Sequence, residues 1–139
     1  VQLWSRTATL PDPVLTVPPG HAVTGLPAYL EIQTPDPWTI DVPDPIRADT
    51  IAIRCTHTEF DVDWGDDSPA VRTNSVGGPY PDGDVRHVYQ VAGAGRTLTV
   101  AEQWTCAWSD SLGHQGVIDN LHSTGHLGLE IREIQSLSG

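Results

Sequence analysis

The sequence contains no lysine and no methionine, and its seven basic side chains, all arginines, stand against eighteen Asp and Glu residues. The resulting formal net charge of −11 would repel the phosphates of nucleic acids and anionic lipid headgroups. We therefore expect neither a nucleic-acid partner nor a membrane-surface partner. The acidity itself needs no explanation beyond solubility.

Long apolar runs are also missing. No run approaches the roughly 20 residues that a membrane-spanning helix needs, and the start VQLWSRTATLPDP lacks the charged, apolar and small-residue zones of a signal peptide. We expect a chain that is soluble as given and does not insert into a membrane. Because the sequence opens on Val1, we expect a mature or trimmed product.

Catalytic signatures are absent from the sequence too. It has no G-x-S-x-G elbow, no H-E-x-x-H pair and no phosphate-binding glycine loop. Paired carboxylates are abundant, but without a concave site they do not identify a general acid and base. We therefore expect no catalytic residues and a protein that is not an enzyme.

Only two cysteines are present, Cys55 and Cys106, and both lie in strand-like runs. Each thiol shares the parity of nearby apolar residues, so each should point toward the interior. A core-crossing disulfide would close a loop of about 50 residues, stabilise the fold by about 4 kcal/mol, and favour an oxidising compartment. Two separate buried thiols are the alternative.

Prolines are concentrated at the start of the chain, where nine of the twelve fall at or before Pro45. A proline removes a backbone donor and pushes its predecessor toward extended geometry. Residues 1–49 are therefore expected to form an extended Pro-rich arm with edge strands, such as the alternating segments 28–32 and 38–42. Residues 50–139 are expected to form the core of the domain.

From residue 50 onward, Thr, Val, Ile and Trp recur with a period of two between clusters of Gly, Asp, Ser and Pro. This pattern predicts an all-β fold, with two antiparallel sheets packed as a β-sandwich. The loops 68–84 and 109–125 are long enough to bind a ligand or a neighbour. The expected strands are 50–57, 59–65, 85–90, 96–108 and 127–135.

Three segments in and between these strands form a composite motif. Asp61-Val-Asp-Trp-Gly-Asp-Asp-Ser68 precedes His87-Val-Tyr89 and then Gly95-Arg-Thr-Leu-Thr-Val100. In this order, the segments resemble the signature of PKD (polycystic kidney disease) domains, in which W-D-F-G-D-G-S precedes H-T-Y and a Y-T-V-T-type strand. Asp67 replaces the second glycine, and the spacer before His87 is longer than usual. The resemblance covers about residues 50–108 and implies an immunoglobulin-like β-sandwich.

The motif residues are expected to maintain the fold. Carboxylates such as Asp63 and Asp66 can accept backbone N–H groups in a tight turn, and Asp67 tolerates left-handed backbone geometry. Large aromatic residues with polar tips suit the core and its edge. The structural turn is expected to comprise Asp63, Trp64, Gly65, Asp66, His87 and Tyr89.

A second resemblance involves the G-L-x-x-Y-L-E segment 25–31, together with the D-W-G-D turn, the H-V-Y and the Trp-rich strand at 104–108. This combination resembles a family of secreted or envelope proteins of high-GC bacteria. It implies an extracellular or cell-envelope location and does not imply an activity.

Two groups of residues are candidate metal ligands, and neither is favoured. The first could offer oxygen ligands to calcium, although its spacing is not that of an EF-hand; its members are Asp61, Asp63, Asp66 and Asp67. The second gathers in the expected loop 109–125 and could offer zinc ligands; its members are His114, His122, His126, Asp110 and Asp119. We expect no bound metal and no cofactor.

The leading functional hypothesis is a non-catalytic extracellular structural or adhesive module, as a subunit of a surface fibre or envelope assembly. Residues 2–10 could add a strand to a neighbour's sheet, with Leu3 and Trp4 as anchors. The partner would be a second copy or another surface protein. The arm could instead pack on its own domain.

The alternative hypothesis is a ligand-binding module for carbohydrate or protein. It would use the loops 68–84 and 109–125 and the aromatic residues Tyr80, Trp104 and Trp108. Strand parity, however, predicts that the two tryptophans are buried. A third hypothesis, a linker domain made rigid by calcium, predicts a melting temperature that rises with calcium.

Overall fold

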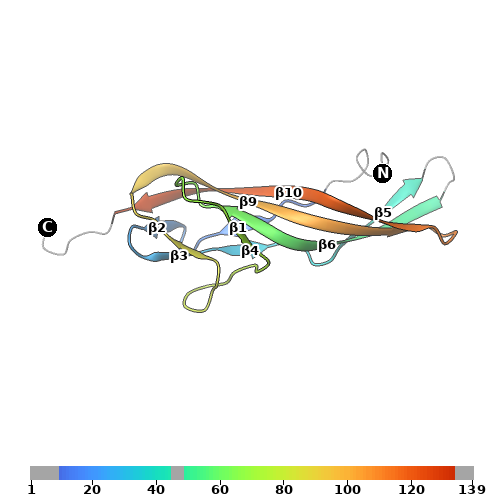
Figure 1. The fold of residues 1–139 in the computed structure, drawn as a ribbon, viewed down its shortest axis with the longest axis horizontal. Helices are drawn as coiled ribbons and strands as arrows, with labels where there is room; N and C mark the ends of the chain where they lie inside the picture. Colours follow the sequence, from blue (N-terminus) through green and yellow to red (C-terminus); the bar gives the residue numbers. More distant parts are fainter. Residues whose placement is uncertain (1–9, 45–48, 134–139) are drawn as a thin grey trace, which may run out of the picture.

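The computed structural model describes residues 10–44 and 49–133, and every regular element in these ranges is a β-strand (Figure 1). The all-β prediction is confirmed. No helix among the described residues is long and apolar enough to cross a membrane. The strands are β1 (Val14–Thr16), β2 (His21–Val23), β3 (Pro27–Tyr29), β4 (Glu31–Gln33), β5 (Trp38–Asp44), β6 (Asp49–Asp63), β7 (Val71–Thr73), β8 (Arg86–Val88), β9 (Gly93–Ser109) and β10 (Gln115–Arg132).

One long sheet forms the body of the molecule and runs along its long axis (Figure 1). Its strand order is β2-β10-β9-β6-β5, and β7 also pairs with β6. The three central strands, β6, β9 and β10, are 15, 17 and 18 residues long. All pairings are antiparallel except that of β2 with the end of β10.

Two small sheets lie against one half of the long sheet (Figure 1). β1 pairs with β4, and β3 pairs with β8, both antiparallel. The backbone N–H of Leu30 donates to the carbonyl oxygen of Val85 at 2.9 Å, which continues the β3–β8 pairing by one residue. The apolar side chains of the two small sheets pack on the long sheet in a proximal cluster of Leu15, Val17, Ala22, Ala28, Leu30, Ile32, Phe60, Val62, Trp64, Val85, Tyr89, Leu98, Val100, Leu129 and Ile131.

The other half of the long sheet carries a second apolar cluster, called here the distal cluster. Its buried members are Val42, Ile53, Cys55, Trp104 and Cys106. The partly buried residues packed against it are Leu10, Trp38, Ile40, Ile51, Trp108, Ile118 and Leu121. All of these except Leu10 belong to the long sheet itself, so no second sheet within the described ranges covers this half.

The expected strands 50–57 and 59–65 are a single strand, β6. A register shift between His57 and Glu59 marks a β-bulge, which inserts one extra residue and reverses the parity of the pattern. Because of this reversal, the alternation of apolar residues predicted two strands where the structure has one. The expected strand 85–90 is shorter, since β8 ends at Val88.

The expected loop 109–125 is wrong, because β10 begins at Gln115 and only residues 110–114 connect it to β9. Ile118 pairs with Cys106 and Leu121 with Trp104, so this stretch completes the distal cluster. A Cβ at position 116 would lie 2.5 Å from the indole nitrogen of Trp108, so Gly116 makes room for that ring. The expected strand 127–135 is the end of β10 as far as Arg132, while residues 134 and 135 lie outside the described ranges.

Candidate functional site

The D-W-G-D turn at the end of β6 has the backbone geometry that its residues favour. Asp63 Oδ1 accepts the backbone N–H of Gly65 at 2.9 Å. Gly65 has a φ of 81°, and a Cβ there would lie 2.3 Å from the carbonyl oxygen of Thr97. Asp67, in the place of a glycine, adopts a left-handed φ of 66°. The turn is therefore fixed by close approach to β9 and by its own carboxylates.

The H-V-Y segment packs against this turn. His87 stacks on Trp64 with ring centroids 5.1 Å apart, and its Nε2 lies 2.7 Å from Asp66 Oδ2. Tyr89 contacts both rings edge-on, and its hydroxyl donates to the carbonyl oxygen of Trp64 at 2.8 Å. The two halves of the motif, 21 to 25 residues apart in sequence, thus pack together as one unit.

Electrostatics reinforce this unit. Partial burial opposes ionisation of Asp66, but hydrogen bonds from Ser68 and His87 outweigh that effect and lower its pKa to about 2. Burial, helped by the negative charge of Asp66, raises the pKa of Tyr89, which therefore stays a hydrogen-bond donor at neutral pH. These contacts stabilise a fold and leave no free acid–base pair.

Cys55 and Cys106 form a disulfide, and both are fully buried. The two residues pair directly on the neighbouring strands β6 and β9, with their Cα atoms 4.0 Å apart. The expected core-crossing bridge is thus wrong in its geometry, because the bond lies within one sheet. It joins the strands β6 and β9 within the distal cluster.

A buried acid was missed at the sequence level. Glu102 is fully buried on β9 and shares the inward face with Val100 and Trp104. Thr34 donates its hydroxyl to Glu102 Oε2 at 2.7 Å, and Ser123 donates to Oε1 at 3.3 Å. A charged residue at an inward position of an apolar alternation was the available signal.

The surroundings of Glu102 favour its neutral form. Burial raises its pKa, and the hydrogen bonds and the nearby His57 offset this only in part. The hydroxyl of Ser123 donates a hydrogen bond to Glu102 and accepts one from the indole N–H of Trp104 at 2.9 Å. Both partners of Ser123 are buried, so its hydroxyl links β9 to β10 inside the core.

The calcium candidates serve other contacts. Asp61 pairs with Arg72 at 3.1 Å, Asp63 and Asp66 hold the turn, and Asp67 is exposed. Across residues 10–44 and 49–133, no three or more His, Cys, Asp and Glu side chains lie together as metal ligands.

The zinc candidates are also separated. His122 and His126 are exposed on β10, not in a loop, and His126 contacts the hydroxyl of Thr99. His114 lies in the turn after β9, where its Nδ1 is 2.9 Å from Asp110. Asp119 accepts the hydroxyl of Thr105.

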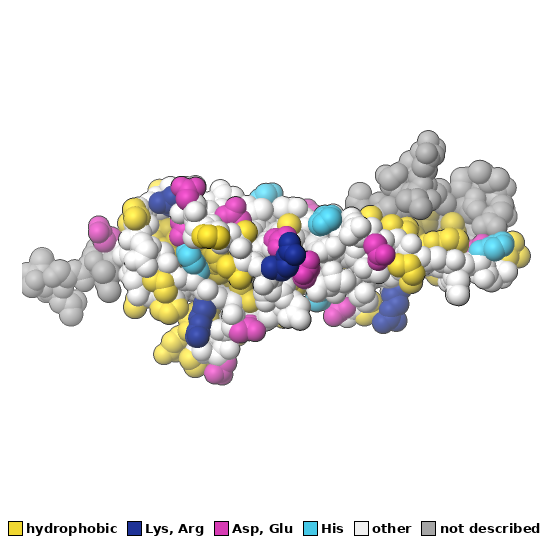
Figure 2. Space-filling view, in the orientation of Figure 1, with side chains coloured by type: hydrophobic (Ala, Val, Ile, Leu, Met, Phe, Trp, Pro, Cys, Tyr) yellow, Lys and Arg dark blue, Asp and Glu magenta, His cyan; other side chains and the backbone are white. Residues whose placement is uncertain are grey.

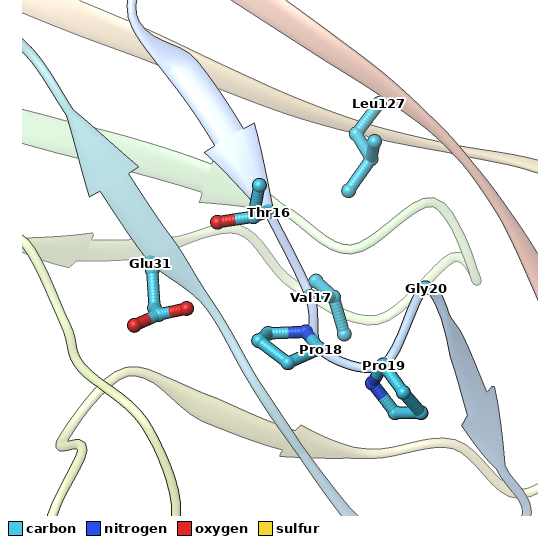
Figure 3. Close-up of a pocket in the computed structure, with 7 residues that line it drawn as sticks. All are labelled: Thr16, Val17, Pro18, Pro19, Gly20, Glu31 and Leu127. Carbon is cyan, nitrogen blue, oxygen red and sulfur yellow. The ribbon is translucent and has the colours of Figure 1, made fainter.

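A mainly apolar pocket of about 390 Å³ opens beside the β1–β2 connection. Figure 3 shows Val17, Pro18 and Pro19 on this connection, with Glu31 on β4 and Leu127 on β10. Glu31 is its one ionisable lining residue, so the pocket has no pair for acid–base chemistry.

The aromatic residues proposed for ligand binding differ in exposure. Trp104 is fully buried and is excluded, whereas Tyr80 is 77% exposed and packs edge-on against Tyr29. Trp108 is half-buried and lines a shallow pocket with Arg54. Of the two expected binding loops, only 68–84 remains largely a loop, since β7 occupies just three of its residues.

The distal half of the molecule also exposes apolar side chains. Figure 2 shows hydrophobic side chains toward both ends of the molecule, including the end that carries β5 and the β9–β10 hairpin. Two exposed apolar residues, Leu112 and Val117, lie at this hairpin. β5 is the last strand of the long sheet here, and β2 pairs only with residues 130–132 of β10. The proposed anchors Leu3 and Trp4 lie outside the described residues.

Comparison of the chain with protein-family models, with curated proteins and with solved structures gave no match. The geometry of the sites above is therefore the basis for the functional argument.

Proposed function

We propose that the chain is a non-catalytic structural or adhesive module of the cell exterior, with an immunoglobulin-like, PKD-like β-sandwich. The interlocking of the D-W-G-D turn with the H-V-Y segment supports the PKD-like assignment. The two small sheets packed on one half of the long sheet support a sandwich there. The disulfide supports an extracellular or envelope location, where oxidising conditions preserve such bonds.

One observation carries the assembly role. Leu10 is the one described residue outside the long sheet that packs on the distal cluster, so the described chain begins at this apolar half. Leu3 and Trp4 are then the anchors, and the strand is donated to the open edge of a neighbouring copy or of another surface protein. Because each copy carries a net charge of −11, apolar contact must drive self-association against repulsion.

Light scattering of the non-reduced chain tests this proposal. We expect a mass above that of the 15.0 kDa monomer, growing with salt as the repulsion is screened. A chain lacking residues 1–9 should be monomeric, as should Trp4→Ala. This deletion leaves β1, which starts at Val14, intact.

Tyr80→Ala is the matched control, because it removes an exposed aromatic residue away from the distal cluster. It should assemble as the parent does. A monomer at every salt concentration, or assembly that survives the deletion, would rule out strand donation. Calcium should change neither the mass nor the melting temperature, whereas a large rise with calcium would favour a calcium-dependent linker.

A ligand-binding module is the second candidate, supported by the loop 68–84 with its exposed Tyr80. Carbohydrate or protein would then bind at this loop, and the Tyr80→Ala variant would lose that binding. The stretch 109–125 no longer supports this candidate, because most of it is strand.

A further inference from the structure

A pocket of about 590 Å³ opens between the D-W-G-D turn and the connection from β8 to β9. Its volume is in the range of small-molecule sites. Its polar lining residues are Asp66, Asp67, Ser68, His87, Gln90 and Arg96, and Val88 and Val91 form an exposed apolar part of the wall.

Two of the three charged residues in this pocket, Arg96 and Asp67, form no ion pair with another described residue. Asp66 is engaged by Ser68 and His87. Arg96, in contrast, has a buried Nε without any hydrogen-bond partner, and it is the one such side-chain atom among the described residues. Within the same ranges, Asp67 likewise has no hydrogen bond or ion pair, and the two groups do not pair with each other. Buried polar groups are normally satisfied, so this side chain is unusual. Because Nε itself is closed to solvent while Arg96 is half-buried and lines the pocket, a ligand would contact the guanidinium through its terminal nitrogens.

The backbone holds the guanidinium of Arg96 in place. A Cβ at position 93 would lie 3.3 Å from Arg96 Nε, so the missing side chain of Gly93 lets the guanidinium pack against the strand. Arg96 lies opposite Leu129 of β10 at the end of the long sheet. Its orientation is therefore fixed by packing, without an ion pair inside the chain.

A ligand with a single charge fits this pocket poorly. An anion would meet Asp66 and Asp67 on a protein whose net charge is −11, and a cation would meet Arg96. A ligand that carries both charges satisfies both uncommitted groups through charge-assisted hydrogen bonds. The exposed Val88 and Val91 add an apolar contact for a small aliphatic side chain.

We propose that this pocket binds a small zwitterion, namely an apolar α-amino acid, with its carboxylate on Arg96 and its ammonium group on Asp67. Ser68, His87 and Gln90 supply further hydrogen-bonding groups around it. This site is separate from the distal cluster and does not depend on the assembly role.

An NMR titration of the isotope-labelled, non-reduced chain with leucine tests the proposal. Two probes isolate its charges: 4-methylpentanoate is leucine without the ammonium group, and 3-methylbutylamine is leucine without the carboxylate. We expect saturable shifts around residues 66–68 and 87–96 with leucine, and binding about tenfold weaker or more for each single-charge probe, since each loses a charged contact.

Variants then assign the roles. Arg96→Gln should weaken leucine binding about tenfold or more by removing the carboxylate partner. Asn, like Asp, tolerates the left-handed backbone geometry of position 67. The Asp67→Asn variant should bind leucine no more tightly than it binds 4-methylpentanoate, because the partner of the ammonium group has been removed. Arg86→Gln is the matched control, because Arg86 is exposed on β8 and does not line the pocket.

No saturable shift with leucine, or equal binding by the Arg96 and Arg86 variants, would overturn the proposal. Equal binding of leucine and both single-charge probes to the parent chain would also overturn it. If Arg96→Gln does not fold, this comparison of probes on the parent chain still decides the question.

Discussion

Glu102 occupies a position between the two apolar clusters of the molecule. It follows Val100 of the proximal cluster and precedes Trp104 of the distal cluster on the same face of β9. Each carboxylate oxygen accepts a hydroxyl, from Thr34 and from Ser123, so the acid connects the β4–β5 connection to β10. A buried polar group with satisfied partners can specify one arrangement of neighbouring strands.

This burial predicts a pH-dependent stability. Since burial raises the folded-state pKa of Glu102 above its ordinary 4.5, its contribution is complete below pH 4.5 and is lost as the pH rises through the folded-state pKa. Glu102→Gln cannot ionise, so it should melt at a higher temperature than the parent near pH 8 and at a similar temperature near pH 4.

Thermal melts across this pH range check the prediction. His57 and Asp36, which lie 3.3 Å apart and act on Glu102 in opposite directions, provide the control. Because the charge of Asp36 raises the pKa of Glu102 less than burial does, most of the melting difference between Glu102→Gln and its background should persist when Asp36→Asn is added to both chains. A Glu102→Gln effect of equal size at pH 4 and pH 8 would contradict a titrating Glu102.

Tyr89 gives a second prediction at this scale. Tyr89→Phe removes the hydrogen bond to the buried carbonyl oxygen of Trp64 and leaves that oxygen unpaired, at a cost of about 1–3 kcal/mol in unfolding free energy. Tyr80→Phe is the control, because Tyr80 is 77% exposed and should change stability by less than about 0.5 kcal/mol. Urea unfolding measures both; equal effects would contradict a structural role for the Tyr89 hydroxyl.

At the scale of elements, strand alternation predicted β5, β6 and β9 well, because Ile53, Cys55, Val100 and Trp104 are all inward-facing and apolar. It failed at β10, whose Gly, His, Ser and Asn residues are typical of loops. Their place in a strand depends on pairing with β9, which local sequence does not contain. The β-bulge at Thr58 was not predicted either, because it too depends on how β6 pairs with β9.

The disulfide between β6 and β9 makes a testable contribution. Cys55→Ala with Cys106→Ala should lower the unfolding free energy by about 4 kcal/mol, because the reduced unfolded chain regains the freedom of a 51-residue loop. Urea unfolding with and without reductant measures this loss. The parent should respond to reductant and the double variant should not; a parent indifferent to reductant would contradict the prediction.

At the scale of the whole molecule, the all-β class could be predicted from composition and from the two-residue period of the apolar side chains. The way in which the sheets pack on one another could not. The proline-rich segment supplies Leu15, Leu30 and Ile32 to the proximal cluster, because tertiary packing gives short strands the partners that they lack alone. The division of the chain at residue 49 stays a prediction. Arg96 was not predicted as a site residue, since only the folded chain shows its orphaned nitrogen.

The disulfide also has a mechanical meaning for a chain held at both ends. Tension cannot stretch the 51 steps between Cys55 and Cys106, so about 170 Å of contour length stays locked while the bond is intact. The D-W-G-D turn, the H-V-Y segment and Arg96 all lie in this locked stretch. A pulled molecule would therefore lengthen only outside it, and a thiol reductant would act as the release that allows the remainder to extend.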